Sequence, residues 1–217
     1  MRTSAERAAA TADIIIKSCA LYTRTEGDPF FFSSGWASPV FIDCKKIISS
    51  PDDRTLLVDL ALESIAEKLT ITSIDFIAGC ELTGVPFATL IADRLQKSLV
   101  LARKQGKGFG RLSQFEGTFE VDDTALLVDD LATDGSSEST FHVALKKAEA
   151  QVAATFVLID FDIFSTEHKT LSLATLKDII KSAETHEYLG PRDLEEIYKF
   201  IDEPARWSRR KGGIASL

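Results

Sequence analysis

The sequence has little of what secreted, membrane-spanning or metal-binding proteins need. Its three cysteines, Cys19, Cys44 and Cys80, form no Cys-x-x-Cys pair and have no histidine at metal-ligand spacing. No apolar run approaches the roughly 18 to 20 residues that cross a bilayer. The opening MRTSAERAAATADIII lacks the basic-then-apolar order of a signal peptide. We therefore expect reduced thiols, no membrane partner and a cytoplasmic location.

Positive charge and proline are also scarce. The 25 Lys and Arg residues against 33 Asp and Glu give a net charge of −8, whereas nucleic-acid backbones are bound through an excess of cations. Nucleic acid is therefore not expected as a partner, and the basic stretch RWSRRKGG at 206–213 is expected to be a solvated terminus. With 6 prolines and 45% hydrophobic residues in 217, the composition predicts one compact domain.

What the sequence does contain is an alternation of short apolar runs with helical segments. The apolar runs lie at 74–78, 98–102, 124–128 and 153–159, and helical patterns at 85–95 and 136–150. This alternation is typical of an α/β fold with a parallel sheet covered on both faces. Ligands of such folds bind at the carboxyl ends of the strands, so the loops after the strands should line one crevice.

Both ends of the chain carry additional elements. A capping box, Thr3-x-x-Glu6, begins a helix expected to reach about residue 21, and PFFFSSGWASPVFIDC predicts a hairpin or pair of edge strands. We call residues 1–50 the hood. The predicted α/β core covers 51–165, starting with a helix at Pro51. The last part, 166–217, is predicted to be a helical extension, with helices near 172–183 and 191–202, and a basic tail.

Two adjacent acids, Asp129 and Asp130, follow the strand at 124–128 and precede a turn of small residues that enters a helix. Such a turn presents free backbone N–H groups at the positive end of a helix, which suits a phosphate. Because two carboxylates would repel that phosphate, we expect them to accept hydrogen bonds from sugar hydroxyls instead, or to bind these hydroxyls through Mg²⁺. The segment predicts a ribose 5-phosphate site. The alternative is a strand that ends in solvated acids before a serine-capped helix.

Two further loops belong to the same predicted crevice. RKQGKGFGRLSQFEG at 103–117 intersperses cations with glycines, so it could close over a polyanion; the alternative is an ordinary solvated loop. GCELTGVP at 79–86 spaces its glycines like a Walker A loop but has Val85 where that motif requires Lys, so we reject this interpretation. A hydrolase triad has no support either, because none of these loops contains a histidine.

In combination, three segments resemble the orotate phosphoribosyltransferase family of type I phosphoribosyltransferases. VDDLATDGSS resembles the family's signature for phosphoribosyl pyrophosphate (PRPP), ARKQGKGFGR its catalytic loop, and FFFSSGWASPVFID its hood, in family order across residues 5–165. The resemblance implies a parallel-sheet α/β fold with an N-terminal hood and a C-terminal helical appendage. It also implies transfer of phosphoribosyl from PRPP to orotate, giving orotidine 5′-phosphate and pyrophosphate for UMP synthesis. The implied enzyme uses Mg²⁺ and is a homodimer whose loop 103–117 reaches the neighbouring site.

The resemblance also assigns roles to residues. The implied catalytic residues are Arg103, Lys104, Lys107, Asp129 and Asp130. The implied PRPP-binding residues are Asp129, Asp130, Leu131, Ala132, Thr133, Asp134, Gly135, Ser136, Ser137, Leu82 and Thr83. The implied base-binding residues are Phe41, Ile42 and Thr133. No protein metal site is implied: Mg²⁺ would be bound mainly through PRPP, near the two acids. We expect the carboxylate of Asp134 to point outward, because it would otherwise oppose the phosphate.

Four positions depart from what many family members carry. Ser33 and Thr83 stand where Lys is common, Phe109 where His is common, and Phe161 where an Arg pairs with the orotate carboxylate. We interpret them as subfamily substitutions, with Glu81 and Arg111 as replacement groups. Two alternatives stay open: a phosphoribosyltransferase for a different base, and a non-catalytic homologue that binds PRPP or a nucleotide.

Overall fold

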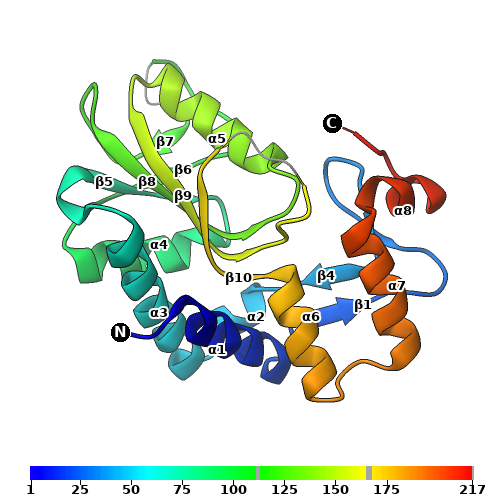
Figure 1. Cartoon of the computed structure of the whole chain (residues 1–217). Helices are drawn as coiled ribbons and strands as arrows, with labels where there is room; N and C mark the ends of the chain where they lie inside the picture. Colours follow the sequence, from blue (N-terminus) through cyan, green and yellow to red (C-terminus); the bar gives the residue numbers. More distant parts are fainter. Residues whose placement is uncertain (111–112, 165–167, 217) are drawn as a thin grey trace.

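The computed structural model describes residues 1–110, 113–164 and 168–216, and its centre is a six-stranded sheet (Figure 1). The strand order is β10-β9-β8-β5-β6-β7; the first five of these run parallel and β7 is antiparallel to β6. The strands are β5 (Phe76–Cys80), β6 (Ser98–Ala102), β7 (Phe115–Glu116), β8 (Thr124–Ala132), β9 (Gln151–Asp160) and β10 (Thr170–Thr175). The predicted parallel α/β architecture is confirmed.

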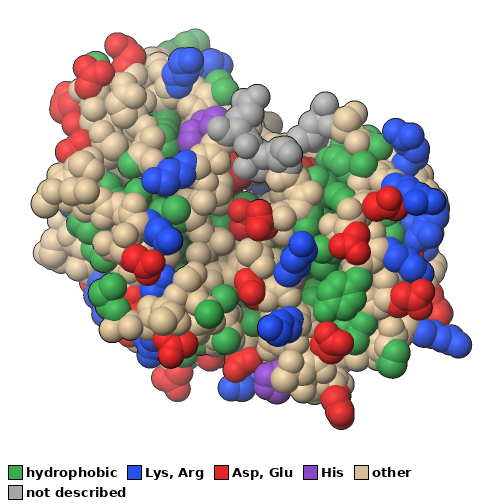
Figure 2. Space-filling model, viewed as in Figure 1, with side chains coloured by type: hydrophobic (Ala, Val, Ile, Leu, Met, Phe, Trp, Pro, Cys, Tyr) green, Lys and Arg blue, Asp and Glu red, His purple; other side chains and the backbone are tan. Residues whose placement is uncertain are grey.

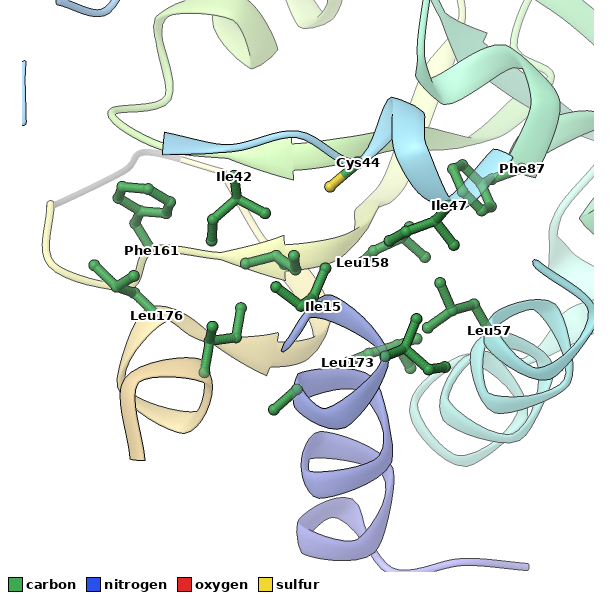
Figure 3. Packing of buried hydrophobic residues seen from close by; sticks show 14 of the residues in the cluster. Ile15, Ile42, Cys44, Ile47, Leu57, Phe87, Leu158, Phe161, Leu173 and Leu176 are labelled. Carbon is green, nitrogen blue, oxygen red and sulfur yellow. The ribbon is translucent and has the colours of Figure 1, made fainter. Parts of the chain in front are cut away.

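Helices cover both faces of the sheet. The helices α1 (Ser4–Lys17), α3 (Pro51–Lys68), α4 (Gly84–Leu95) and α6 (Leu176–Thr185) pack on one face, and α5 (Ser136–Lys147) packs on the other. Figure 3 shows part of the larger core, where helix side chains such as Ile15, Leu57 and Phe87 gather with side chains of the sheet and of the segment at 45–48. Each such side chain, once fully buried, contributes about 1.5–3 kcal/mol. The sheet is therefore fixed from both sides, and its carboxyl edge is a rigid base for a site.

The sequence signals for helix starts are confirmed. Thr3 and Glu6 form the predicted capping box, with the Glu6 backbone N–H donating to the Thr3 hydroxyl at 3.3 Å. Ser50 caps α3, and Pro51 occupies its first turn, where a missing N–H costs nothing. The first helix ends at Lys17 rather than near residue 21, because Leu21 begins a strand.

The hood consists of two small antiparallel pairs. β1 (Leu21–Thr23) pairs with β4 (Val40–Ile42), and β2 (Phe30–Phe31) pairs with β3 (Ala37–Ser38). A short helix, α2 (Lys45–Ile48), leads back to the core. The predicted hairpin is therefore present.

The strand that carries the acid pair is longer than predicted. β8 continues past Val128 to Ala132, so Asp129 and Asp130 lie within the strand and not in the loop after it. The reason is its long neighbour β9, which extends the ladder by pairing Val157 with Asp129. The phosphate-loop turn accordingly begins at residue 133.

The segment after residue 165 is not purely helical. β10 is the edge strand of the central sheet, parallel to β9, and the helix predicted near 172–183 is α6, which begins only at Leu176. The capping box of Thr175 and Asp178 fixes that start. A division at residue 165 would therefore cut a strand from the core. The second predicted helix is confirmed as α7 (Pro191–Asp202).

The basic stretch at 206–213 is not a solvated terminus. It lies largely in α8 (Pro204–Arg210), where Trp207 is buried against Phe200. The chain then returns to the hood, and the Ile214 N–H donates to the Gly35 carbonyl at 3.1 Å. Basic side chains gather at this end of the molecule, over α7 and α8 (Figure 2). Two buried side chains dock this basic segment: Trp207 packs in the core, and Ser208 accepts a hydrogen bond from the Ala37 N–H of the hood at 3.0 Å.

All three cysteines lie in the described part of the chain. Cys19, Cys44 and Cys80 are free thiols, as predicted. Among the described residues, no helix combines the length and the apolar character required to cross a membrane.

Candidate active site

A cavity of about 330 Å³ lies where the carboxyl ends of the sheet meet the hood. Three walls form it. The strand wall consists of Asp129, Asp130, Leu131, Thr133 and Ser137. The loop wall consists of Glu81, Leu82, Thr83 and Lys104. The hood wall consists of Phe31, Phe32, Ser33, Phe41, Ile42, Asp43, Cys44 and Lys45. A larger hollow of about 730 Å³ lies beside α5 and contains none of the predicted site residues, so the chemistry points to the smaller cavity.

The strand wall contains two adjacent carboxyl groups, those of Asp129 and Asp130. Burial, together with the negative charge of Asp130, raises the pKa of Asp129 well above its usual range, and burial also raises the pKa of Asp130. The Asp130 N–H donates to Asp129 Oδ1 at 2.9 Å, and the Cys44 thiol donates to the Asp130 carboxylate. Two half-buried acids that line a cavity favour a cation or a pair of hydroxyl donors as ligand, because either relieves their repulsion.

The turn at 133–137 has the backbone of an anion site. Gly135 adopts φ +79°, a left-handed conformation that favours glycine, and α5 begins directly after it. Thr133 and Ser137 face the cavity from this turn. The positive end of the α5 dipole is thus directed at the cavity's strand wall.

The prediction for Asp134 is wrong. Its side chain is only 3% exposed, and Oδ1 accepts hydrogen bonds from the Ser136 N–H at 3.0 Å and the Ser136 hydroxyl at 2.7 Å. Its other oxygen, Oδ2, accepts one from the hood's Ser34 hydroxyl. A short carboxylate is well suited to cap a helix start, where the dipole favours negative charge. Asp134 therefore uses one amide of the turn and ties the turn to the hood.

The loop wall lies directly beside the acid pair. The peptide bond between Glu81 and Leu82 is cis, and the Lys104 N–H donates to Glu81 Oε2 at 3.3 Å. Gly84 follows this turn, and a Cβ there would lie 2.6 Å from the Val128 carbonyl oxygen. The loop can approach the strand this closely only with glycine at 84.

Only part of the basic loop reaches the cavity of its own chain. Of the three implied cationic catalytic residues, Lys104 lines the cavity, whereas Arg103 pairs with Glu116 at 2.6 Å and Lys107 is outside the lining. Phe109 is fully exposed at the loop tip. Arg111 lies outside the described residues.

The hood wall is mostly apolar. The implied base-binding residues Phe41 and Ile42 line it, together with Ser33, one of the four departures. Phe161 is 1% exposed and packs edge-on against Phe32 with ring centroids 5.7 Å apart. It therefore belongs to the core, and Phe32 of the hood wall lies between it and the cavity.

Sequence reasoning assigned no role to five residues of the hood wall: Phe31, Phe32, Asp43, Cys44 and Lys45. The last three follow the predicted base-binding pair Phe41 and Ile42 without a break, so sequence adjacency was a signal that could have found them. Of the implied PRPP-binding residues, the cavity lining does not include Ala132, Asp134, Gly135 and Ser136.

Glu138, in the first turn of α5, is a buried acid outside the cavity. It is 3% exposed; Oε1 accepts a weak hydrogen bond from the Thr170 hydroxyl at 3.4 Å, and Oε2 has no partner among the described residues. Burial, with the nearby charge of Asp160, raises its pKa to about 7.

Glu138→Gln is expected to flatten the dependence of stability on pH. The folded-state pKa lies above the unfolded value of 4.5, so the group's contribution is complete below pH 4.5 and is lost as pH rises through about 7. At about 1.4 kcal/mol per pH unit, this loss amounts to about 3 kcal/mol. Urea unfolding at pH 5 and pH 8 measures it: the fall in unfolding free energy between the two should be smaller in the variant by about that amount. An equal fall in both proteins would contradict a buried, titrating Glu138.

The parallel sheet, the hood over its carboxyl edge and the acid pair beside a helix start define the chain as a type I phosphoribosyltransferase. A solved adenine phosphoribosyltransferase from Saccharomyces cerevisiae shares this fold, with TM-score 0.57 and 23% identity over 76% of this chain and 99% of that one. The solved structure of an orotate phosphoribosyltransferase from Aeropyrum pernix has a TM-score of 0.67. It is 30% identical in sequence, and the match covers 82% of this chain and 99% of that one.

No family model matches the sequence. A curated relative, the orotate phosphoribosyltransferase of Rhizobium etli, is 36% identical over 197 residues, which cover 88% of this chain and 86% of the relative. The chain belongs to the orotate phosphoribosyltransferase family. The family and fold implied by the three sequence segments are thereby confirmed.

Proposed function

We propose that this protein transfers the phosphoribosyl group of PRPP to orotate, giving orotidine 5′-phosphate and pyrophosphate in UMP synthesis. The observation that carries this conclusion is the cavity in which an acid pair, a helix start and an aromatic wall meet. Family membership supports the same reaction. The three walls match the three parts of the reacting complex: phosphorylated ribose, departing diphosphate and incoming base.

The strand wall binds the ribose 5-phosphate. Backbone N–H groups at 133–137 and the hydroxyls of Thr133 and Ser137 donate to the 5-phosphate. Asp129 and Asp130 accept hydrogen bonds from ribose hydroxyls, which adds donors to the single one that each half-buried carboxylate has within the chain. This arrangement fixes C1 of the ribose between the loop wall and the hood wall.

The chemistry is a substitution at C1. The bond from C1 to the diphosphate oxygen breaks through an oxocarbenium-like state, and its electrons leave with the diphosphate. A ring nitrogen of orotate forms the new bond to C1 and loses its proton, which the departing diphosphate can accept. Catalysis then consists of holding the base in place and stabilising charge on the departing group. Lys104 stabilises the departing diphosphate from the loop wall, and Arg103 and Lys107 do so from the rest of the basic loop at 103–117.

Mg²⁺ is the proposed metal ion. No group of three or more His, Cys, Asp or Glu side chains that could hold a metal occurs in the part of the chain that the structure describes. One or two carboxylates with substrate phosphates are the usual Mg²⁺ environment, and Asp129 and Asp130 fit it. When bound there, the ion supplies neutralising charge to the diphosphate.

We further propose a homodimer in which loop 103–117 serves the neighbouring site. Within one chain, Arg103 is occupied by Glu116, and neither Lys107 nor Phe109 lines the cavity. A basic loop of whose described cations only Lys104 lines the anion site of its own chain is consistent with service to a second chain. The cytoplasmic location stays a prediction.

Lys107→Ala is expected to lower kcat at least 100-fold, on the order of the effect of removing one preorganised charge-stabilising group. The decisive readout is subunit mixing with an Asp129→Asn protein, also impaired alone. If loops are exchanged, half of the dimers are mixed and each has one intact site, so about a quarter of wild-type activity returns. Lys147→Ala, an exposed lysine on α5, is the control and keeps full activity. Mixing without any recovery would contradict loop exchange.

The four departures are proposed to be variation within the family. Ser33 and Thr83 line the cavity, so their hydroxyls can contact substrate where a longer cation is usual; Glu81 lies on the same wall as Thr83. Phe161 contributes to the core instead.

A panel of bases tests the proposed reaction. Purified protein is incubated with PRPP and Mg²⁺ in the presence of orotate, uracil, adenine or no base, and pyrophosphate release is followed. Release that depends on orotate supports the proposal. Release with another base alone would indicate a different phosphoribosyltransferase, and PRPP binding without release would indicate a non-catalytic homologue.

A further inference from the structure

The charges that line the cavity are unfavourable for anionic substrates. Four lining residues are acidic, Asp43, Glu81, Asp129 and Asp130, whereas two are basic, Lys45 and Lys104. Both PRPP and a base with a carboxylate bring negative charge into this space, so each needs a cation nearby. The positions of the two lysines therefore decide which anion each can bind.

The two lysines lie on different walls. Lys104 belongs to the loop wall, where its backbone contacts Glu81, whereas Lys45 belongs to the hood wall and is the first residue of α2. In a displacement at a sugar carbon, the incoming and departing groups occupy opposite faces of the ring. If Lys104 and the loop wall receive the diphosphate, the hood wall receives the base.

The Lys45 side chain is available for a ligand. It is 70% exposed, and its contact to Asp43 Oδ1 is long, at 4.0 Å. The next residue, Lys46, is engaged elsewhere: its Nζ donates to the Cys19 carbonyl at 2.8 Å and lies 4.6 Å from the centre of the Tyr22 ring. Two adjacent lysines thus differ in the one property that matters here, access to the cavity.

The other hood-wall residues cannot neutralise a carboxylate. Besides Asp43 and Lys45, they are Phe31, Phe32, Ser33, Phe41, Ile42 and Cys44. Behind Phe32 lies the buried Phe161, the residue after β9, so this position brings no charge to the wall. A carboxylate placed against these aromatic and aliphatic groups would lose its hydration without compensation.

We propose that Lys45 binds the carboxylate of the base and so sets the preference for orotate over uncharged pyrimidines. This inference rests on the proposed function. Lys45 would then be a specificity residue of the hood. Among the described residues of the hood wall, no other side chain is positively charged.

The test is the kinetics of Lys45→Met, which keeps the length of the side chain without its charge. The KM for orotate should rise about 10- to 100-fold, the range expected for one charge-assisted contact, while the KM for PRPP changes less than about twofold. The ratio of kcat/KM for orotate to that for uracil should fall by the same factor. Lys45→Arg should restore most of the orotate affinity.

The matched control is Lys46→Met, which should leave both KM values unchanged. A thermal unfolding curve of each variant shows whether it is folded; because Lys45 is exposed, its melting temperature should match the wild type. A rise in the KM for PRPP, or an unchanged KM for orotate in a folded Lys45→Met, would overturn the inference while leaving the reaction itself intact. A wild-type protein that does not use orotate would instead refute the proposed function.

Discussion

Replacing Asp129 by Asn is expected to lower kcat/KM for PRPP about 100-fold, the effect of losing one or two charge-assisted hydrogen bonds to ribose. The same change should raise the free energy of unfolding at pH 8. Burial and Asp130 raise the pKa of Asp129, so ionisation is penalised in the folded protein, and stability falls as pH rises from the unfolded value through the folded one. Asn is neutral at every pH and can still accept the Asp130 N–H.

This opposition between activity and stability distinguishes a functional acid from a structural one. Steady-state kinetics give kcat/KM for PRPP, and urea unfolding at pH 8 gives the free energy of unfolding. Asp52→Asn, at an exposed position in the first turn of α3, is the control and should leave kcat/KM unchanged. If Asp129→Asn destabilised the protein at pH 8 and left PRPP kinetics intact, the acid pair would be part of the scaffold only.

Gly84→Ala is expected to destabilise the protein by about 2 to 3 kcal/mol and to displace the acid pair. A Cβ at this position would lie 2.6 Å from the Val128 carbonyl oxygen and 2.8 Å from the Asp129 Cα. These are backbone atoms of a central strand, so they cannot move aside as a flexible side chain could. The loop wall must separate from the strand wall, and kcat/KM for PRPP should fall together with the melting temperature.

The matched control is Gly190→Ala, at the start of α7. Its Cβ would meet only Asp193 Oδ2 at 3.8 Å, which is ordinary contact. Its φ of −74° suits any residue, so the change should cost less than about 1 kcal/mol. Thermal unfolding of the two variants side by side tests the close approach; equal melting temperatures would contradict it.

The parts of the fold predicted from sequence are those specified by local chemistry. The capping groups of α1 and α3 and the continuous apolar runs of β5 and β6 are signals within a few residues. The parts that were missed depend on distant partners. β8 extends to Ala132 because β9 continues alongside it, and β10 is a strand because it completes the sheet edge.

The same distinction holds for the site. The acid pair and the glycine turn could be predicted from the sequence, because their residue types are unusual after an apolar strand. The orientation of the Asp134 side chain was predicted wrongly for two reasons. Its partner Ser34 is 100 residues away in the sequence. The prediction also considered repulsion by a phosphate but not the helix start, which stabilises a negative charge at this position. Lys45 was missed because a single lysine after a hairpin carries no motif; its place in the cavity lining is visible only in the folded chain.

The most direct test of the proposed reaction is the fate of both substrates followed by phosphorus NMR, with orotate measured in the same tube. With wild-type protein, PRPP, Mg²⁺ and orotate, we expect the PRPP signals to be replaced by pyrophosphate and one new phosphate monoester in equal amounts, while orotate disappears at the same rate. Unchanged PRPP, or pyrophosphate formed without loss of orotate, would contradict the proposed transfer.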